Sequence, residues 1–114
     1  MEKLGWFDVN AFQGALDATR VSRRFSWRQV AAETGVSAST LTRMTQGKRP
    51  DLDGMAALVV WSGLSADDYI GPYRSEPSPL GVISSYIWRD ENLSFQAAVA
   101  LDELVKATYE RLRN

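Results

Sequence analysis

The chain has 114 residues, a formal net charge of −1, and neither cysteine nor histidine. Those two absences exclude disulfides, thiolate nucleophiles, imidazole bases and zinc sites built from cysteine and histidine, so we expect a protein that is not an enzyme and uses no cofactor or metal. With 45% hydrophobic residues, the chain has enough apolar material for one small domain with an appended element.

The sequence carries no signal for secretion or for a membrane. Its first ten residues lack the apolar core of a secretory signal. The longest wholly apolar run, 55–61, is far shorter than the roughly 20 residues that span a bilayer. We therefore expect a cytoplasmic protein with no membrane partner.

Charge is unevenly distributed along the chain. Residues 18–50 hold seven basic side chains and one acidic one, a local net charge of +6, whereas the remaining residues carry −7. A basic segment in an acidic chain is typical of a surface that binds a polyanion such as DNA. The alternative is a solvated helical face, and charge alone does not decide between the two.

Capping residues and glycines predict five helices in the first 71 residues. They are expected over about 8–23, 27–34, 38–45, 50–62 and 65–70. Ser26 and Ser37 are natural N-caps for the second and third helices, and Gly35 ends the second, where a left-handed residue is needed. The residues expected on inward faces are Phe12, Ala15, Leu16, Thr19, Val30, Ala31, Leu41, Met44, Leu52, Met55, Leu58 and Val59. No alternation of apolar and polar residues predicts a strand.

A proline-rich stretch separates this part from the C-terminal third. Three of the four prolines fall within 72–79, which we interpret as a linker. Two helices are expected after it, over about 79–89 and 95–112. An apolar seam with spacings of 3, 4, 3 and 4 is predicted along the last helix at Ala98, Leu101, Val105, Thr108 and Leu112.

The most informative stretch is 26–50, where two short helices flank the turn Thr34-Gly35-Val36-Ser37. Ala31 is small where two closely crossing helices need a small residue, and Val36 and Leu41 can fill the space between them. This pattern is typical of a helix-turn-helix, whose second helix enters the major groove of DNA.

The segment resembles the helix-turn-helix of the Cro/C1 repressor (XRE-type) family of transcriptional regulators. The resemblance is carried by Val30-Ala31, Gly35-Val36-Ser37, Thr40-Leu41-Thr42-Arg43 and Gln46-Gly47-Lys48. It implies an all-α fold, with a five-helix lambda-repressor-like DNA-binding domain over 1–71 and a two-helix C-terminal extension over 80–114. The implied function is sequence-specific binding of double-stranded DNA by a transcriptional regulator, most simply a repressor.

The resemblance also implies roles for single residues. Ala38, Ser39 and Arg43 occupy its base-reading positions, and arginine reads guanine through a bidentate contact. The residues expected to meet phosphates are Ser26, Arg28, Ser37, Thr40, Gln46, Lys48 and Arg49. Arg20, Arg23 and Arg24 are expected to form a solvated basic flank instead.

Two positions depart from the family pattern. Trp27 stands where glutamine is common at the start of the second helix, and we expect it to pack rather than to touch DNA. Thr45 stands where glutamate is common late in the third helix. Without that glutamate, Arg20 is expected to lack its internal ion pair and to be free for solvent or phosphate.

The sequence leaves open which partners the protein has besides DNA. The acidic, amphipathic C-terminal helices are expected to form a homodimer interface, or else to complete the core of a monomer. Two rival functions remain open: an antitoxin that represses its own operon and holds a toxin, and a protein-binding module with a degenerate helix-turn-helix.

Overall fold

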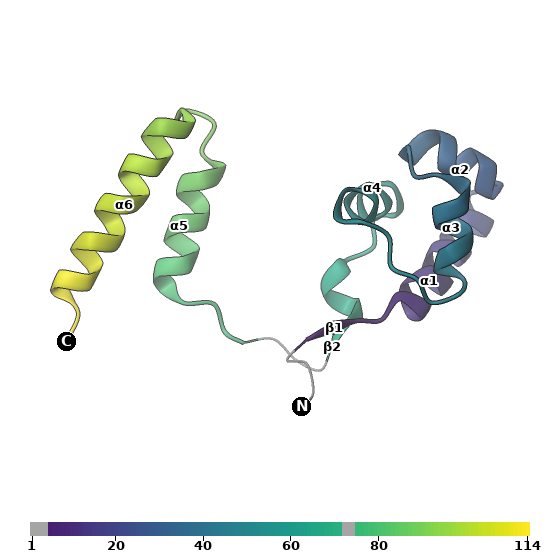
Figure 1. The fold of residues 1–114 in the computed structure, drawn as a ribbon, viewed down its shortest axis with the longest axis horizontal. Coiled ribbons are helices and arrows are strands. Elements are labelled where there is room, and N and C mark those ends of the chain that lie inside the picture. Colours follow the sequence, from purple (N-terminus) through teal and green to yellow (C-terminus); the bar gives the residue numbers. More distant parts are fainter. Residues whose placement is uncertain (1–4, 72–74) are drawn as a thin grey trace. The chain divides into compact units, whose positions relative to one another are not determined.

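The computed structural model describes residues 5–71 and 75–114 and is mostly helical, as the all-α prediction requires (Figure 1). In chain order, its elements are β1 (Trp6–Phe7), α1 (Val9–Ser22), α2 (Trp27–Thr34), α3 (Ala38–Met44), α4 (Leu52–Ser62), the 3₁₀ helix η1 (Ala66–Tyr69), β2 (Ile70–Gly71), α5 (Pro79–Arg89) and α6 (Phe95–Leu112). The chain divides into two compact units, 1–74 and 75–114, which we describe separately.

The helix boundaries of the first unit follow its capping residues. The hydroxyl of Ser26 accepts a hydrogen bond from the backbone N–H of Gln29, whose side chain accepts one from the Ser26 N–H at 2.7 Å. Gly35 then ends α2 in the left-handed conformation, with φ 75°. The Ser37 hydroxyl caps α3 by accepting a hydrogen bond from the Thr40 N–H, without the reciprocal side-chain bond seen at Ser26. These predicted helix starts and ends are confirmed.

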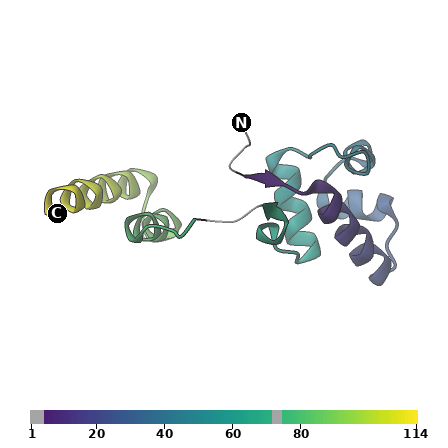
Figure 2. The ribbon, with the colours of Figure 1, turned by 90° about the horizontal axis from the view of Figure 1, so that it is seen from below.

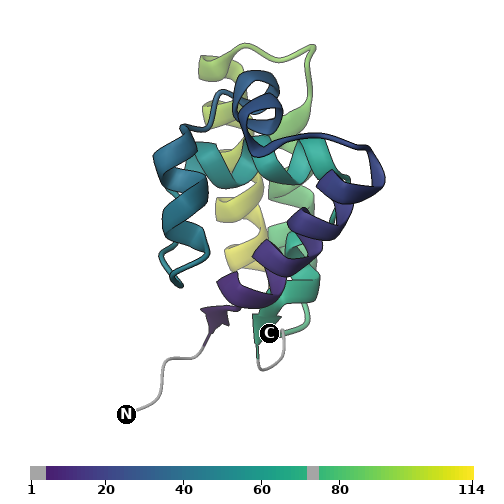
Figure 3. The same ribbon diagram turned by 90° about the vertical axis from the view of Figure 1, so that its right-hand side faces the viewer.

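The core of the first unit is built from all four α-helices. Its most deeply buried side chains are Phe12 and Leu16 of α1, Val30 of α2, Met44 of α3 and Leu58 of α4. In Figure 3 α2 is seen nearly end-on, while the following helix, α3, is seen from the side. Because one face of each helix is buried in this core, the opposite face is exposed. The packing of α3 in the core therefore determines which of its side chains meet solvent.

The expectation that the chain has no strand was wrong. Trp6 pairs with Gly71 and Phe7 with Ile70 in a short antiparallel ladder. A Cβ at Gly71 would lie only 2.5 Å from the Trp6 ring, so glycine permits this close approach. Two-residue strands are too short to show alternation, which is why the sequence pattern did not reveal them.

Two finer expectations about the first unit were also wrong. The short helix predicted at 65–70 is present as the 3₁₀ helix η1, but the Ser65 side chain makes no capping bond, and Ile70 belongs to β2 instead of the helix. Strand pairing at Ile70 requires extended backbone, which stops the helix. Leu52, expected inward, is 85% exposed, because α4 begins there and its buried side is set by Leu58.

The second unit is an antiparallel hairpin of α5 and α6, which lie side by side in Figures 1 and 2. Its buried residues are Ala98 and Asp102. The predicted seam was therefore only partly right, because Leu101 and Leu112 are exposed. The interior instead runs from Ala98 through Asp102 to the half-buried Val105. A prediction based on the spacing of apolar residues does not reveal that an aspartate is buried on the inner side of α6.

Asp102 is held by polar partners on both helices. Its carboxylate accepts a hydrogen bond from the Ser84 hydroxyl at 2.5 Å and pairs with Lys106 Nζ at 2.7 Å. The bond from Lys106, and then that from Ser84, lower the pKa of Asp102 below its ordinary value of 3.8. The bond from Ser84 therefore links α5 to the buried carboxylate of α6, whereas Lys106 pairs with it from within α6.

We expect this carboxylate to make the hairpin sensitive to acid. Since the pKa of Asp102 is lower in the folded chain, its contribution to stability is present above pH 3.8 and is lost as the pH falls through the lowered value. Asp102→Asn should therefore reduce the protection of α6 amides from hydrogen exchange at pH 7 and show a smaller further loss at pH 3 than the wild type. The exposed neighbour provides the control, Glu103→Gln, and identical pH profiles for the two variants would contradict this role.

Within the described residues, none of the helices has the length and apolar character needed to cross a membrane.

Candidate nucleic-acid interface

The outward face of α3 is defined by the side chains that hold its other face in the core. Leu41 and Met44 are 4% and 1% exposed, and Val36 of the preceding turn is buried beside them. Ala38, Ser39 and Arg43 are all exposed. The structure thus brings the three predicted base-reading residues together on the solvent side of one short helix.

Hydrogen bonds link the polar residues of this face. The Ser37 hydroxyl donates to Thr40 Oγ1 at 2.9 Å and lies 3.1 Å from the Ser39 hydroxyl. Arg43 Nη2 also donates to Thr40 Oγ1, at 3.2 Å. Thr40 therefore accepts two bonds and orients the Arg43 side chain along α3. Its own hydroxyl hydrogen remains to serve an acceptor such as a phosphate oxygen.

The other predicted phosphate-contacting residues come from two segments. Ser26 and Arg28 lie at the start of α2, whereas Gln46, Lys48 and Arg49 lie in the loop after α3, and all five are exposed. The backbone N–H of Lys48 donates to the Arg43 carbonyl at 3.1 Å, which attaches the loop to the end of α3. Arg49 makes a long contact of 3.4 Å with the Phe7 carbonyl and stays exposed.

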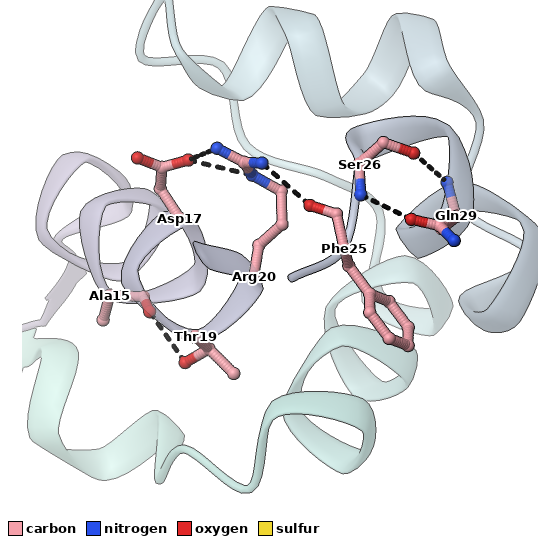
Figure 4. Close-up of polar contacts among 7 residues, drawn as sticks. All are labelled: Ala15, Asp17, Thr19, Arg20, Phe25, Ser26 and Gln29. Carbon is pink, nitrogen blue, oxygen red and sulfur yellow. Dashed lines mark hydrogen bonds and ion pairs between the residues drawn. The ribbon is translucent and has the colours of Figure 1, made fainter. Parts of the chain in front are cut away.

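The expectation that Arg20 is free was wrong (Figure 4). Its Nε and Nη2 both donate to Asp17 Oδ1, at 3.0 and 2.7 Å, and Nη1 donates to the Phe25 carbonyl at 2.8 Å. The guanidinium carbon lies 5.0 Å from the centre of the Trp27 ring. Arg20 therefore joins the end of α1 to the start of α2. Asp17, three residues earlier on the same helix, is the sequence signal that could have revealed this pair.

Arg23 also has a structural task, although it is exposed as predicted. Its Nη1 donates to the Trp61 carbonyl at 2.6 Å, and its guanidinium lies over the Trp61 ring. The indole N–H of Trp61 in turn donates to Glu33 Oε2 at 3.0 Å. These contacts join α1, α2 and α4, so part of the basic segment serves the fold.

An acidic feature beside α3 was not foreseen. An open groove of about 380 Å³ lies between the helix-turn-helix turn and the start of α4, and Ser37 and Thr40 line it together with Asp51 and Asp53. Asp51 caps α4 through the Gly54 N–H at 2.7 Å. The carboxylates repel an anion, so any phosphate that meets Ser37 or Thr40 has to approach these hydroxyls from outside the groove.

A smaller, largely apolar hollow of about 150 Å³ lies between α2 and α3. It is lined by Trp27, Ala38, Leu41, Thr42 and Thr45. Trp27 packs against the core from this position, as expected, and Thr45 at the end of α3 lines the same hollow.

No protein-family model, curated protein or solved structure matches this chain. Among residues 5–71 and 75–114, no cluster of three or more acidic side chains is arranged to hold a metal ion.

Proposed function

We propose that residues 5–71 form a lambda-repressor-like domain that binds double-stranded DNA in a sequence-specific way and acts as a transcriptional repressor. The observation that carries the proposal is the exposed line of Ala38, Ser39 and Arg43 on a helix whose opposite side is anchored by Leu41 and Met44. A helix supported in this way can enter the major groove with its side chains against the base edges.

The charge that remains on the surface supports the same proposal. Arg20 is held by Asp17 and Phe25, and the exposed Arg23 by the Trp61 carbonyl, but the other five cations of the basic segment are exposed without those contacts: Arg24, Arg28, Arg43, Lys48 and Arg49. Arginine and lysine contacts to phosphates supply most of the non-specific affinity of DNA-binding proteins. In this proposal Arg43 reads a base, and Arg28, Lys48 and Arg49 position the domain on the backbone.

A second candidate is an antitoxin that also holds a protein toxin. It is favoured by the large apolar side chains exposed on α5 and α6, such as Tyr86 and Leu104, which suit a protein partner. This alternative keeps the DNA-binding role of α3 and adds a second partner.

Selection of duplexes from a random pool tests the proposal. The full chain should enrich one short motif, and its affinity should fall steeply as salt rises. A variant with Arg28, Lys48 and Arg49 changed to glutamine, but with Arg43 kept, should lose affinity for every duplex. Failure to retain any duplex at low salt would favour the protein-binding module with a degenerate helix-turn-helix.

A further inference from the structure

Helix α4 is apolar on part of its solvent side as well as on the side that packs in the core. Val60 is 82% exposed, Ala56, one turn earlier, is also exposed, and Trp61 is half-buried. The one charged side chain of α4 is that of Asp53. Because a helix that is apolar all round is typically buried, this part of α4 indicates a surface that another molecule covers.

Two open hollows follow one another along α4. The first has a volume of about 460 Å³ and lies between α4 and the end of α2. Its lining consists of Glu33, Thr34, Ala56, Ala57, Val60 and Trp61. The second is the acidic groove of about 380 Å³ that Asp51 and Asp53 line. Because Thr34 and Ala57 line both hollows, the two form one continuous surface, which we call the α4 trench.

The end of the α4 trench at Val60 and Trp61 is mainly apolar. Its carboxylate, Glu33, accepts a hydrogen bond from the Trp61 indole N–H at 3.0 Å. The Arg23 guanidinium lies over the same ring, 4.8 Å from its centre. One acid and one base therefore offset each other here, and the exposed Val60 side chain is the feature that a partner can cover.

The opposite end of the α4 trench is acidic. Asp51 uses Oδ1 to cap α4, and the Asp53 carboxylate makes no hydrogen bond or ion pair with any residue that the structure describes. Arg43 reaches this end from α3, through its 3.2 Å bond to Thr40. Of the described residues, no lysine or arginine lines either hollow. This end therefore attracts a cationic side chain.

We propose that the α4 trench binds a helical segment of a different protein, with a large apolar side chain at the Val60 end and a lysine or arginine at the Asp53 end. Residues 53–61 span about 12 Å at 1.5 Å per residue, so a partner helix lying along the trench carries its basic residue about seven or eight positions from its apolar anchor. The apolar contact supplies affinity, and the charge fixes the direction of the segment. A nucleic acid does not suit the trench because carboxylates repel phosphate. A twofold pair of trenches does not suit it either, since neither acidic end then receives a cation.

Selection of peptides from a random-sequence library on the full chain, without DNA, tests the α4 trench. Enriched peptides should combine a large apolar residue with lysine or arginine about seven or eight positions away. Val60→Glu places a carboxylate at the apolar end and should weaken these peptides by at least about tenfold. The control, Val21→Glu, makes the same change at an exposed valine of α1 that lines neither hollow, and should leave them bound. Enrichment of no such peptide, or equal binding by the two variants, overturns the proposal.

The acidic end has a separate test that avoids any change to apolar residues. Asp53→Asn should weaken the selected peptides about twofold to fivefold at low salt, because it removes an exposed carboxylate. Asp68→Asn removes an exposed carboxylate from η1, outside both hollows, and should leave their binding unchanged. An equal loss in both variants would mean that the peptides respond to overall charge, which overturns the proposal.

Sedimentation of the chain alone tests the remaining occupant, a second copy of this chain. The wild type and Val60→Glu should sediment alike, because the proposed partner is absent from the sample. Self-association that Val60→Glu abolishes would identify a second copy as the occupant and overturn the proposal.

Discussion

Arg43→Ala should weaken binding to the selected DNA site by about 1–3 kcal/mol, roughly 5–150-fold, and remove the preference at one base pair. Arg43 is exposed on α3, and its bond to Thr40 holds the guanidinium along the helix rather than in the core. Its loss therefore removes a reading group without opening a cavity. Fluorescence anisotropy against the selected duplex and its single-base variants measures both effects.

The matched control is Lys48→Ala, which removes an exposed cation from the loop just after α3. A residue that meets only phosphate should weaken all duplexes by a similar factor and lower the slope of log affinity against log salt by about 1. We therefore expect Arg43→Ala to change the base preference and Lys48→Ala to change the affinity for all duplexes alike. If both lose affinity uniformly, Arg43 contacts the backbone and the assignment of α3 as the reading helix is wrong.

Much of the helical layout could be predicted because its signals are local. A serine that can bond the N–H three residues later, as at Ser26 and Ser37, fixes a helix start whatever surrounds it. The β1–β2 ladder depends on residues more than 60 positions apart in the sequence, and each strand holds two residues. Such pairing leaves no periodic pattern, so it was missed.

The exposed residues of the candidate site could be predicted because buried residues recur at a regular spacing along a helix. Leu41 and Met44 had to face inward, which left Ser39 and Arg43 outside. The partners of Arg20 were missed because Arg20 was expected to lack an ion pair when Thr45 stands where the family has glutamate. The carboxylate of Asp17, on the same helix, provides that ion pair instead. The acidic groove was missed for a related reason: Asp51 and Asp53 lie beyond α3 in the sequence, and only folding of α4 places them beside Ser37 and Thr40.

Arg20→Lys should lower the free energy of unfolding by about 1–3 kcal/mol, although it conserves the charge. The arginine side chain is 23% exposed and uses three nitrogens at once, two on Asp17 and one on the Phe25 carbonyl. A lysine ammonium cannot reproduce this fork, and it loses much of the stacking on Trp27. The carbonyl of Phe25 is then left without its cationic donor at the junction of α1 and α2.

Thermal unfolding of the full chain, followed by tryptophan fluorescence, measures the loss. For a domain of this size each kcal/mol corresponds to about 4–8 °C in Tm. Arg24→Lys makes the same chemical change at an exposed residue nearby and should alter Tm by less than about 0.5 kcal/mol equivalent. Equal stability of the two variants would mean that the contacts of Arg20 contribute little. A selective loss in Arg20→Lys, with DNA affinity retained well below Tm, would identify Arg20 as the residue that holds α2 against α1 and so supports α3.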